Sequence, residues 1–263
     1  MWGVFMFTVL KVNPFQKPPI FKRLFYRSPE PILTRVPLRG GAFFYTAECF
    51  ADKRGNADLS VLPDLVGGCA QRILLQDTKI PILPPLQIFE PVLYPQILFL
   101  NTAIDFLCAL PDAPNLRTLG FVDPEARLQK TIVPFVRQAK TVKIFTDFPK
   151  RYDELAKEIL ADWGLSVIVS ACADVLRDCN VLLAPFLKTE NGLGGVLQYG
   201  IPKVCYAGDG CVLPAEFEAR RPQGVAADAF ASALYELCNQ KELENLRYTR
   251  LKPIKSMAMY VLK

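Results

Sequence analysis

The sequence predicts an α/β protein that contains a doubly wound parallel sheet, with a smaller, Pro-rich α/β lobe on its N-terminal side. Two observations lead to this fold class. From residue 116 onward, short apolar runs alternate with stretches whose apolar residues recur at helical spacing, and this alternation is typical of a parallel sheet covered by helices. Twelve of the 22 prolines lie within residues 1–95, where they prevent long helices and central strands.

The elements of the parallel sheet follow from apolar periodicity and from helix boundary residues. Residues 150–163 carry an apolar stripe at helical spacing, and Gly164 stands where this helix ends. Asp123, Pro124 and Glu125 supply a helix cap, a proline at the first helical position and an acid in the first turn. The expected strands are 116–122, 142–146, 165–169, 181–184 and 203–206, and the expected helices are 124–139, 150–163, 174–178, 195–199 and 227–238.

The N-terminal lobe is expected to hold two short pairs of strand and helix. The strands are predicted at 42–46 and 72–76, and the helices at 59–70 and 95–110. The resulting division of the chain is a basic Pro-rich arm over 1–40, the small lobe over 41–115, the parallel-sheet domain over 116–240 and a basic segment over 241–263.

The composition excludes several kinds of site. The chain of 263 residues has no histidine, so it cannot contain a Ser-His-Asp triad, a Cys-His dyad or a metal site with a histidine ligand. Its eight cysteines form no C-x-x-C pair, which argues against a zinc ribbon. We expect no metal site, and we expect most of the cysteines to be buried, reduced thiols.

Nothing in the sequence predicts secretion or a membrane span. Residues 1–10 are apolar, but no basic residue precedes them and no small-residue cleavage site follows. The longest apolar stretch, 97–110, contains Asn101 and Asp105, and it is shorter than the ~20 residues of a membrane helix. Together with the reduced thiols, these observations predict a cytoplasmic protein.

The positive charge lies at the two ends of the chain. Residues 1–40 hold seven basic residues and one acidic residue, residues 241–263 hold six and two, and the remaining 41–240 have a net charge of −5. Aromatic residues alternate with the bases of the arm, a pattern that suits an anionic or protein partner bound through 11–39. The alternative is that the aromatic rings pack on the body of the protein while the charges stay in water.

The order of strands and helices over 116–240 is that of a Rossmann-like domain, in which ligands bind at the carboxyl ends of the strands. The first strand is followed by Asp123 and Arg127 in place of the G-x-G-x-x-G loop that holds a pyrophosphate. Asp147 follows the second strand, 24 residues beyond Asp123, where the ribose-binding acid of a dinucleotide fold belongs. Asp147 is equally suited to cap the next helix.

A glycine-rich loop follows the fourth strand, and its free N–H groups suit a phosphate or simply form a turn. Asp209 lies in a polar turn after the fifth strand. We therefore expect one ligand-binding rim, made by Asp123, Arg127, Asp147, Glu190, Asn191, Gly192, Gly194, Gly195, Gln198 and Asp209.

The segment from Asn180 to Val204 resembles the donor-binding domain of GT-B type glycosyltransferases. It contains Asn180-Val-Leu-Leu-Ala-Pro185, then Glu190 and Gln198 eight positions apart, then Gly200-Ile-Pro202 before the last strand. The second position of the pair is Gln where many retaining members have Glu. The resemblance implies that Glu190 lies near the transferred sugar and Gln198 near the ribose of a nucleotide sugar, with Arg127 or Lys130 at the diphosphate.

The sequence predicts three alternative functions. The first is binding of a nucleotide or another small anionic ligand at the rim, without evident catalytic machinery. The second is an enzyme, either an NAD(P)-dependent oxidoreductase or a glycosyltransferase-like protein that uses a nucleotide sugar; without histidine, its acid and base groups would be Asp123, Asp147, Glu190 or Asp209. The third is a scaffold or assembly component that uses the basic arm.

Overall fold

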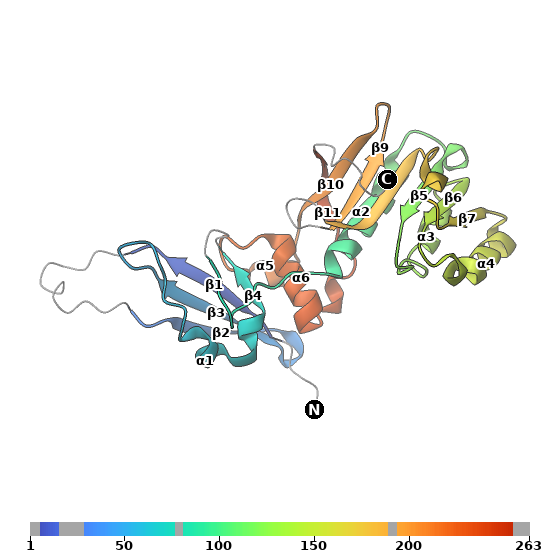
Figure 1. The fold of residues 1–263 in the computed structure, drawn as a ribbon. Helices are drawn as coiled ribbons and strands as arrows, with labels where there is room; N and C mark the ends of the chain where they lie inside the picture. The colour runs from blue at the N-terminus through green and yellow to red at the C-terminus, as the bar shows by residue number, and fades with distance from the viewer. Residues whose placement is uncertain (1–5, 16–28, 77–80, 189–193, 255–263) are drawn as a thin grey trace, which may run out of the picture. The chain divides into compact units, whose positions relative to one another are not determined.

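The computed structural model describes residues 6–15, 29–76, 81–188 and 194–254 of the chain. These residues form two compact units, and each unit is made from separate stretches of the chain (Figure 1). The first unit comprises residues 1–94 and 213–244, and the second comprises 95–212 and 245–263. Among the residues described, no helix is long and apolar enough to cross a membrane.

The first unit is built on a four-stranded mixed sheet. Its central strand β1 is parallel to both of its neighbours, β3 and β4, whereas β2 at the edge is antiparallel to β3. The strand order is β2-β3-β1-β4. The strands are β1 (Thr8–Asn13), β2 (Ile32–Pro37), β3 (Phe43–Phe50) and β4 (Ile73–Leu75).

Side chains that alternate along β3 pack on opposite faces of this sheet. Ala47 and Cys49 face α1 (Leu62–Val66) and the 3-10 turn η3 (Gly67–Gln71) and form one buried cluster with them. Phe44 faces the other way, where its ring stacks on Phe7 at 5.0 Å and meets the edge of Phe230 at 5.4 Å. Phe230 belongs to α6 (Ala227–Cys238), so a helix distant in sequence covers this face of the sheet.

The remaining helical pieces of the first unit are short. They are η2 (Arg39–Gly41), α5 (Ala215–Glu218) and η7 (Lys241–Leu243).

The second unit is built on a seven-stranded sheet with two different halves. In one half, β8, β5, β6 and β7 are parallel. In the other half, β8, β9, β10 and β11 are antiparallel to one another in succession. The order is β11-β10-β9-β8-β5-β6-β7. The strands are β5 (Thr118–Val122), β6 (Thr141–Phe145), β7 (Ser166–Ser170), β8 (Val181–Lys188), β9 (Gly194–Tyr199), β10 (Val204–Cys211) and β11 (Tyr248–Ile254).

Helix α2 (Tyr94–Ala109) packs closely on the antiparallel half of this sheet. The ring of Phe99 lies directly over Gly195, where a Cβ atom would come within 2.2 Å of the ring. The end of α2 is held by buried Arg117, whose guanidinium donates hydrogen bonds to the carbonyl oxygens of Leu107 at 2.7 Å and Leu110 at 3.1 Å. The other helical pieces of this unit are η4 (Pro114–Leu116), α3 (Val133–Val136), η5 (Pro149–Tyr152), α4 (Asp153–Trp163) and η6 (Ala173–Leu176).

The predicted doubly wound parallel sheet is wrong, although the protein is of mixed α/β structure as expected. The main cause is the segment 195–199, which was predicted as a helix and instead forms β9, paired antiparallel with both β8 and β10. A turn of Gly200 and its neighbours, with φ +98° at Gly200, joins β9 to β10 as a hairpin. The sheet is therefore mixed, and neither half is a doubly wound Rossmann sheet.

The predicted helix over 124–139 is also wrong. The structure contains only α3, Val133–Val136, in this stretch. Ala126 has a φ of +54°, which is left-handed and incompatible with a continuing right-handed helix. Pro134 then lies where a longer helix would need a backbone donor.

Several other elements agree closely with the sequence predictions. The strands β5 to β8 and the helices α4 and α6 lie where they were expected. In contrast, β1 and β2 were not predicted; both lie within the first 40 residues, in the stretch interpreted as a basic arm. All eight cysteines are free thiols, of which six are buried and two, Cys108 and Cys172, are exposed.

Candidate functional site

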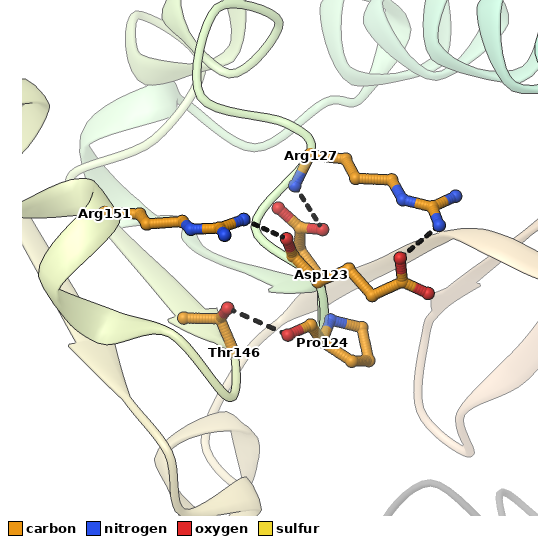
Figure 2. Close-up of polar contacts among 6 residues, drawn as sticks. Asp123, Pro124, Arg127, Thr146 and Arg151 are labelled. Atoms are coloured by element: carbon orange, nitrogen blue, oxygen red, sulfur yellow. Dashed lines mark hydrogen bonds and ion pairs between the residues drawn. The ribbon is translucent and has the colours of Figure 1, made fainter.

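The carboxyl ends of β5 and β6 bring together part of the predicted rim (Figure 2). Asp123 follows β5 directly, and Thr146 and Asp147 follow β6. From β5 the chain passes to β6 and β7 on one side and then returns to β8 on the other side of β5. At such a reversal the loops leaving the two neighbouring strands diverge, and ligands of parallel sheets bind in the crevice between them.

Asp123 is completely buried, and the chain itself uses its carboxylate. The backbone N–H groups of Arg127 and Leu128 each donate to a carboxylate oxygen at 2.9 Å, and the hydroxyl of Tyr152 donates to the same oxygen as Leu128. Burial and the neighbouring Asp123 raise the pKa of Tyr152 because both disfavour the phenolate. The Asp123 carboxylate thus fixes the turn that follows β5.

Contacts from the segment after β6 hold the same turn. The Thr146 hydroxyl donates to the carbonyl oxygen of Pro124 at 3.2 Å, and the backbone N–H of Asp147 donates to it at 2.9 Å. The guanidinium of Arg151 donates to the carbonyl oxygen of Glu125 at 3.2 Å (Figure 2). These bonds support the left-handed conformation of Ala126, which an L-residue adopts only when its surroundings impose it.

Arg127 extends from this turn toward β8. Its exposed guanidinium is ion-paired with the carboxylate of Glu125 and lies 5.5 Å from the centre of the Phe186 ring on β8. Arg151 is exposed as well, and its guanidinium lies 4.7 Å from the centre of the Phe148 ring. The edge therefore carries two guanidinium groups next to aromatic rings.

The structure gives the remaining predicted residues several different surroundings. Asp147 is exposed, and it is the Thr146 hydroxyl that accepts a hydrogen bond from the Phe148 N–H, 3.2 Å away, at the start of the next helical turn. Gly194 and Gly195 lie on β9, where Pro95 and Phe99 of α2 cover them. Glu190, Asn191 and Gly192 lie outside the described residues.

Gln198 and Asp209 lie away from the turn after β5. Gln198 is paired with Leu182, near the amino end of β8, and so lies toward the opposite edge of the sheet. Asp209 is on β10, which β8 and β9 separate from β5; at ~4.8 Å per strand this is on the order of 14 Å. Hydrogen bonds from Lys252 and Arg250 of β11 lower the pKa of Asp209.

Sequence reasoning missed four residues of this edge. Tyr152 was part of the apolar stripe of a helix, and nothing in its position revealed that its hydroxyl meets Asp123. Thr146 and Arg151 lie in the same segment after the second strand as the predicted Asp147. The argument that selected Asp147, that ligands bind beyond the carboxyl ends of the strands, could have selected them as well. Phe186 lies beyond the strand predicted over 181–184, because β8 extends further, to Lys188. The four residues are Thr146, Arg151, Tyr152 and Phe186.

At this edge a ligand would be bound by side chains and not by backbone N–H groups. In a glycine-rich loop, the backbone N–H groups at this position bind a phosphate. Here the N–H groups of Arg127 and Leu128 donate to the Asp123 carboxylate instead. Within the described ranges, no cluster of three or more Cys, Asp and Glu side chains is placed to hold a metal ion.

No protein-family model, no curated protein and no solved structure matches this chain, so the resemblance to glycosyltransferases stays a prediction based on the sequence.

Proposed function

We propose that the protein binds a small anionic ligand, one that carries a phosphate or carboxylate group, at the carboxyl edge between β5 and β8. The observation that carries this proposal is the position of Arg127. Its guanidinium lies between the turn after β5 and Phe186 of β8, and its ion-pair partner is the exposed Glu125. Arg151 lies on the other side of the same turn and adds a second positive charge to this edge of the sheet.

The ion pair with Glu125 leaves Arg127 available to a ligand. Both side chains are about half exposed, at 49% for Arg127 and 63% for Glu125, and ion pairs in water contribute little stability. A phosphate or carboxylate that takes the place of Glu125 forms two parallel hydrogen bonds with the planar guanidinium. The Phe186 ring limits the directions that the guanidinium adopts.

The turn behind Arg127 gives the site a rigid base. Asp123, Tyr152 and Thr146 fix its backbone through buried or half-buried hydrogen bonds. These groups are committed to the turn, and the phenol of Tyr152 is buried with a raised pKa. We therefore propose binding rather than a reaction at this edge.

The narrower hypotheses stay predictions. Nucleotides, including NAD(P) and nucleotide sugars, belong to the proposed ligand class, and binding measurements choose among them.

In the scaffold hypothesis, the basic residues of 11–39 bind a partner. The described basic residues of this stretch have contacts within the first unit: Lys11 pairs with Glu48 at 3.7 Å, Arg39 pairs with Glu216 at 2.9 Å, and the Arg35 guanidinium lies 3.7 Å from the centre of the Phe43 ring.

Titration calorimetry with pyrophosphate, citrate, AMP, NAD and a nucleotide sugar tests the proposal. We expect at least one of these anions to bind, and we expect Arg127→Gln to weaken it about tenfold or more, because hydrogen bonds between charged groups contribute ~1.5–3 kcal/mol. The matched control is Arg247→Gln, which also removes one exposed arginine from an ion pair, here with Asp105. The proposal is wrong if no anion binds at millimolar concentration, or if both variants bind like the original protein.

A further inference from the structure

A cavity of about 830 Å³ lies at the carboxyl edge of the four-stranded sheet of the first unit. It is lined by the end of β1 and the residues after it, by the hairpin 51–57 that follows β3, and by Pro81 and Leu83. A smaller cavity of about 330 Å³ adjoins it and shares Ala57, Pro81 and Leu83 as a common wall. Cavities of this size are typical of sites for small molecules.

The strand order gives a reason for a ligand site at this place. Strand β1 lies between β3 and β4 and is parallel to both, and the chain visits β3 on one side of β1 before it forms β4 on the other side. The order of the strands thus reverses at β1. The crevice beyond the carboxyl end of such a strand is where open α/β sheets bind their ligands.

Hydrogen bonds fix the polar wall of the cavity. Asp52 Oδ1 accepts hydrogen bonds from the N–H groups of Arg54 at 2.8 Å and Asn56 at 2.9 Å, and the Asp52 N–H donates to the Asn56 carbonyl oxygen at 2.7 Å. On β1, the Asn13 amide donates to Glu48 at 2.9 Å. This bond uses one donor of Asn13 and leaves its carbonyl oxygen for another partner.

The apolar wall includes a large side chain that is exposed to water. Leu83 is 71% exposed and separates the two cavities. Val12 and Ala57 contribute further apolar surface. A ligand that covers Leu83 removes this apolar surface from water, and that burial favours binding.

The residues that line the cavity have no net charge, and this favours an uncharged ligand over an ion. Asp52 and Lys53 are the acidic and basic side chains of the lining, and their charges cancel. Asn13 and Asn56 each offer both a donor and an acceptor. We propose that this cavity binds an uncharged small molecule with an apolar ring and with amide-like hydrogen-bonding groups at the edge of that ring. This inference goes beyond the proposed function, since it concerns another sheet and a ligand without charge.

Binding of adenine, uracil, nicotinamide and indole, followed by saturation-transfer NMR and calorimetry, tests the inference. We expect at least one of these compounds to bind, and we expect Leu83→Ala and Asn56→Ala each to weaken it severalfold. Both side chains are exposed, so these variants are expected to keep the fold. Ala57→Phe fills the cavity and should abolish binding; Ala219→Phe, at an exposed alanine in the same unit, is its control.

Three outcomes would overturn the inference. They are the absence of binding by every compound at millimolar concentration, unchanged binding by Leu83→Ala, Asn56→Ala and a folded Ala57→Phe, and loss of binding in Arg127→Gln. The last outcome would place the compound at the β5 edge instead. Conversely, Arg127→Gln should bind ring compounds like the original protein even if no anion binds, so failure of one proposal is distinguishable from failure of the other.

Discussion

The turn after β5 and the hairpin after β3 each contain an aspartate whose carboxylate accepts hydrogen bonds from two backbone N–H groups further along the chain. Asp123 accepts from Arg127 and Leu128, and Asp52 accepts from Arg54 and Asn56, all at 2.8 to 2.9 Å. The two differ in depth: Asp123 is completely buried and has Tyr152 as a third donor, whereas Asp52 is partly exposed.

This difference in depth determines what each hydrogen bond contributes. At the exposed hairpin, water replaces a lost acceptor, and the net contribution of a hydrogen bond is modest. At the turn after β5, the Leu128 N–H and the Tyr152 hydroxyl are buried and the Arg127 N–H is partly buried, so removal of the carboxylate leaves all three donors without their acceptor in the protein. The same kind of hydrogen bonding, from two backbone N–H groups to one aspartate carboxylate, therefore stabilises one loop strongly and the other weakly.

Replacement of the buried aspartate should have the largest effect. Asp123→Ala leaves the N–H groups of Arg127 and Leu128 and the hydroxyl of Tyr152 without an acceptor. We expect a loss of ~3 kcal/mol or more in the free energy of unfolding, measured with urea. An equal loss in Asp52→Ala would show that depth does not separate the two loops.

Tyr152→Phe should have an intermediate effect and change the pH dependence. At neutral pH it removes one buried hydrogen bond, and we expect a loss of ~1–2 kcal/mol. The folded pKa of Tyr152 lies above its ordinary value of 10.0, so its contribution is fully present below that value. Above it, the unfolded chain releases the phenol proton first, and the stability of the folded protein falls as the pH rises.

The measurement for Tyr152 is the free energy of unfolding of both proteins across the alkaline range. The difference between the original protein and Tyr152→Phe should shrink as the pH rises above the ordinary tyrosine value, because the variant has one such proton fewer. The other tyrosines are common to both proteins and cancel in the comparison. A difference that is constant with pH would contradict the buried contact between Tyr152 and Asp123.

Prediction from sequence succeeds where the pattern is local. Helix α4 was predicted because its apolar stripe repeats over several turns and Gly164 ends it with a left-handed residue. Strands β5 to β8 were predicted because each is a short apolar run followed by polar or turn residues. Asp123 was placed correctly at the end of β5, since the strand boundary alone determines its position.

Other features depend on contacts between distant residues. Asp123, Pro124 and Glu125 are residues typical of a helix start, and they predicted a helix after β5. The Asp123 carboxylate instead closes a turn in which Ala126 is left-handed. Residues 195–199 are too few to reveal a period, and their conformation is decided by pairing with β8 and β10 and by Phe99 over Gly195. Strand β1 was not predicted because its partners, β3 and β4, come later in the chain.

Replacement of the partly exposed aspartate should have the smallest effect on stability. Asp52→Ala removes the acceptor of two hydrogen bonds in the hairpin, and we expect a loss of only ~0.5–1 kcal/mol because water takes its place. Asp52→Asn keeps an oxygen at the same position and is the matched control. The hairpin is a wall of the cavity, so Asp52→Ala should also weaken the binding of ring compounds, whereas Asp52→Asn should bind them nearly as well as the original protein. If Asp52→Ala destabilised the protein as strongly as Asp123→Ala, the hairpin would belong to the folded core, and the contrast between the two loops would fail.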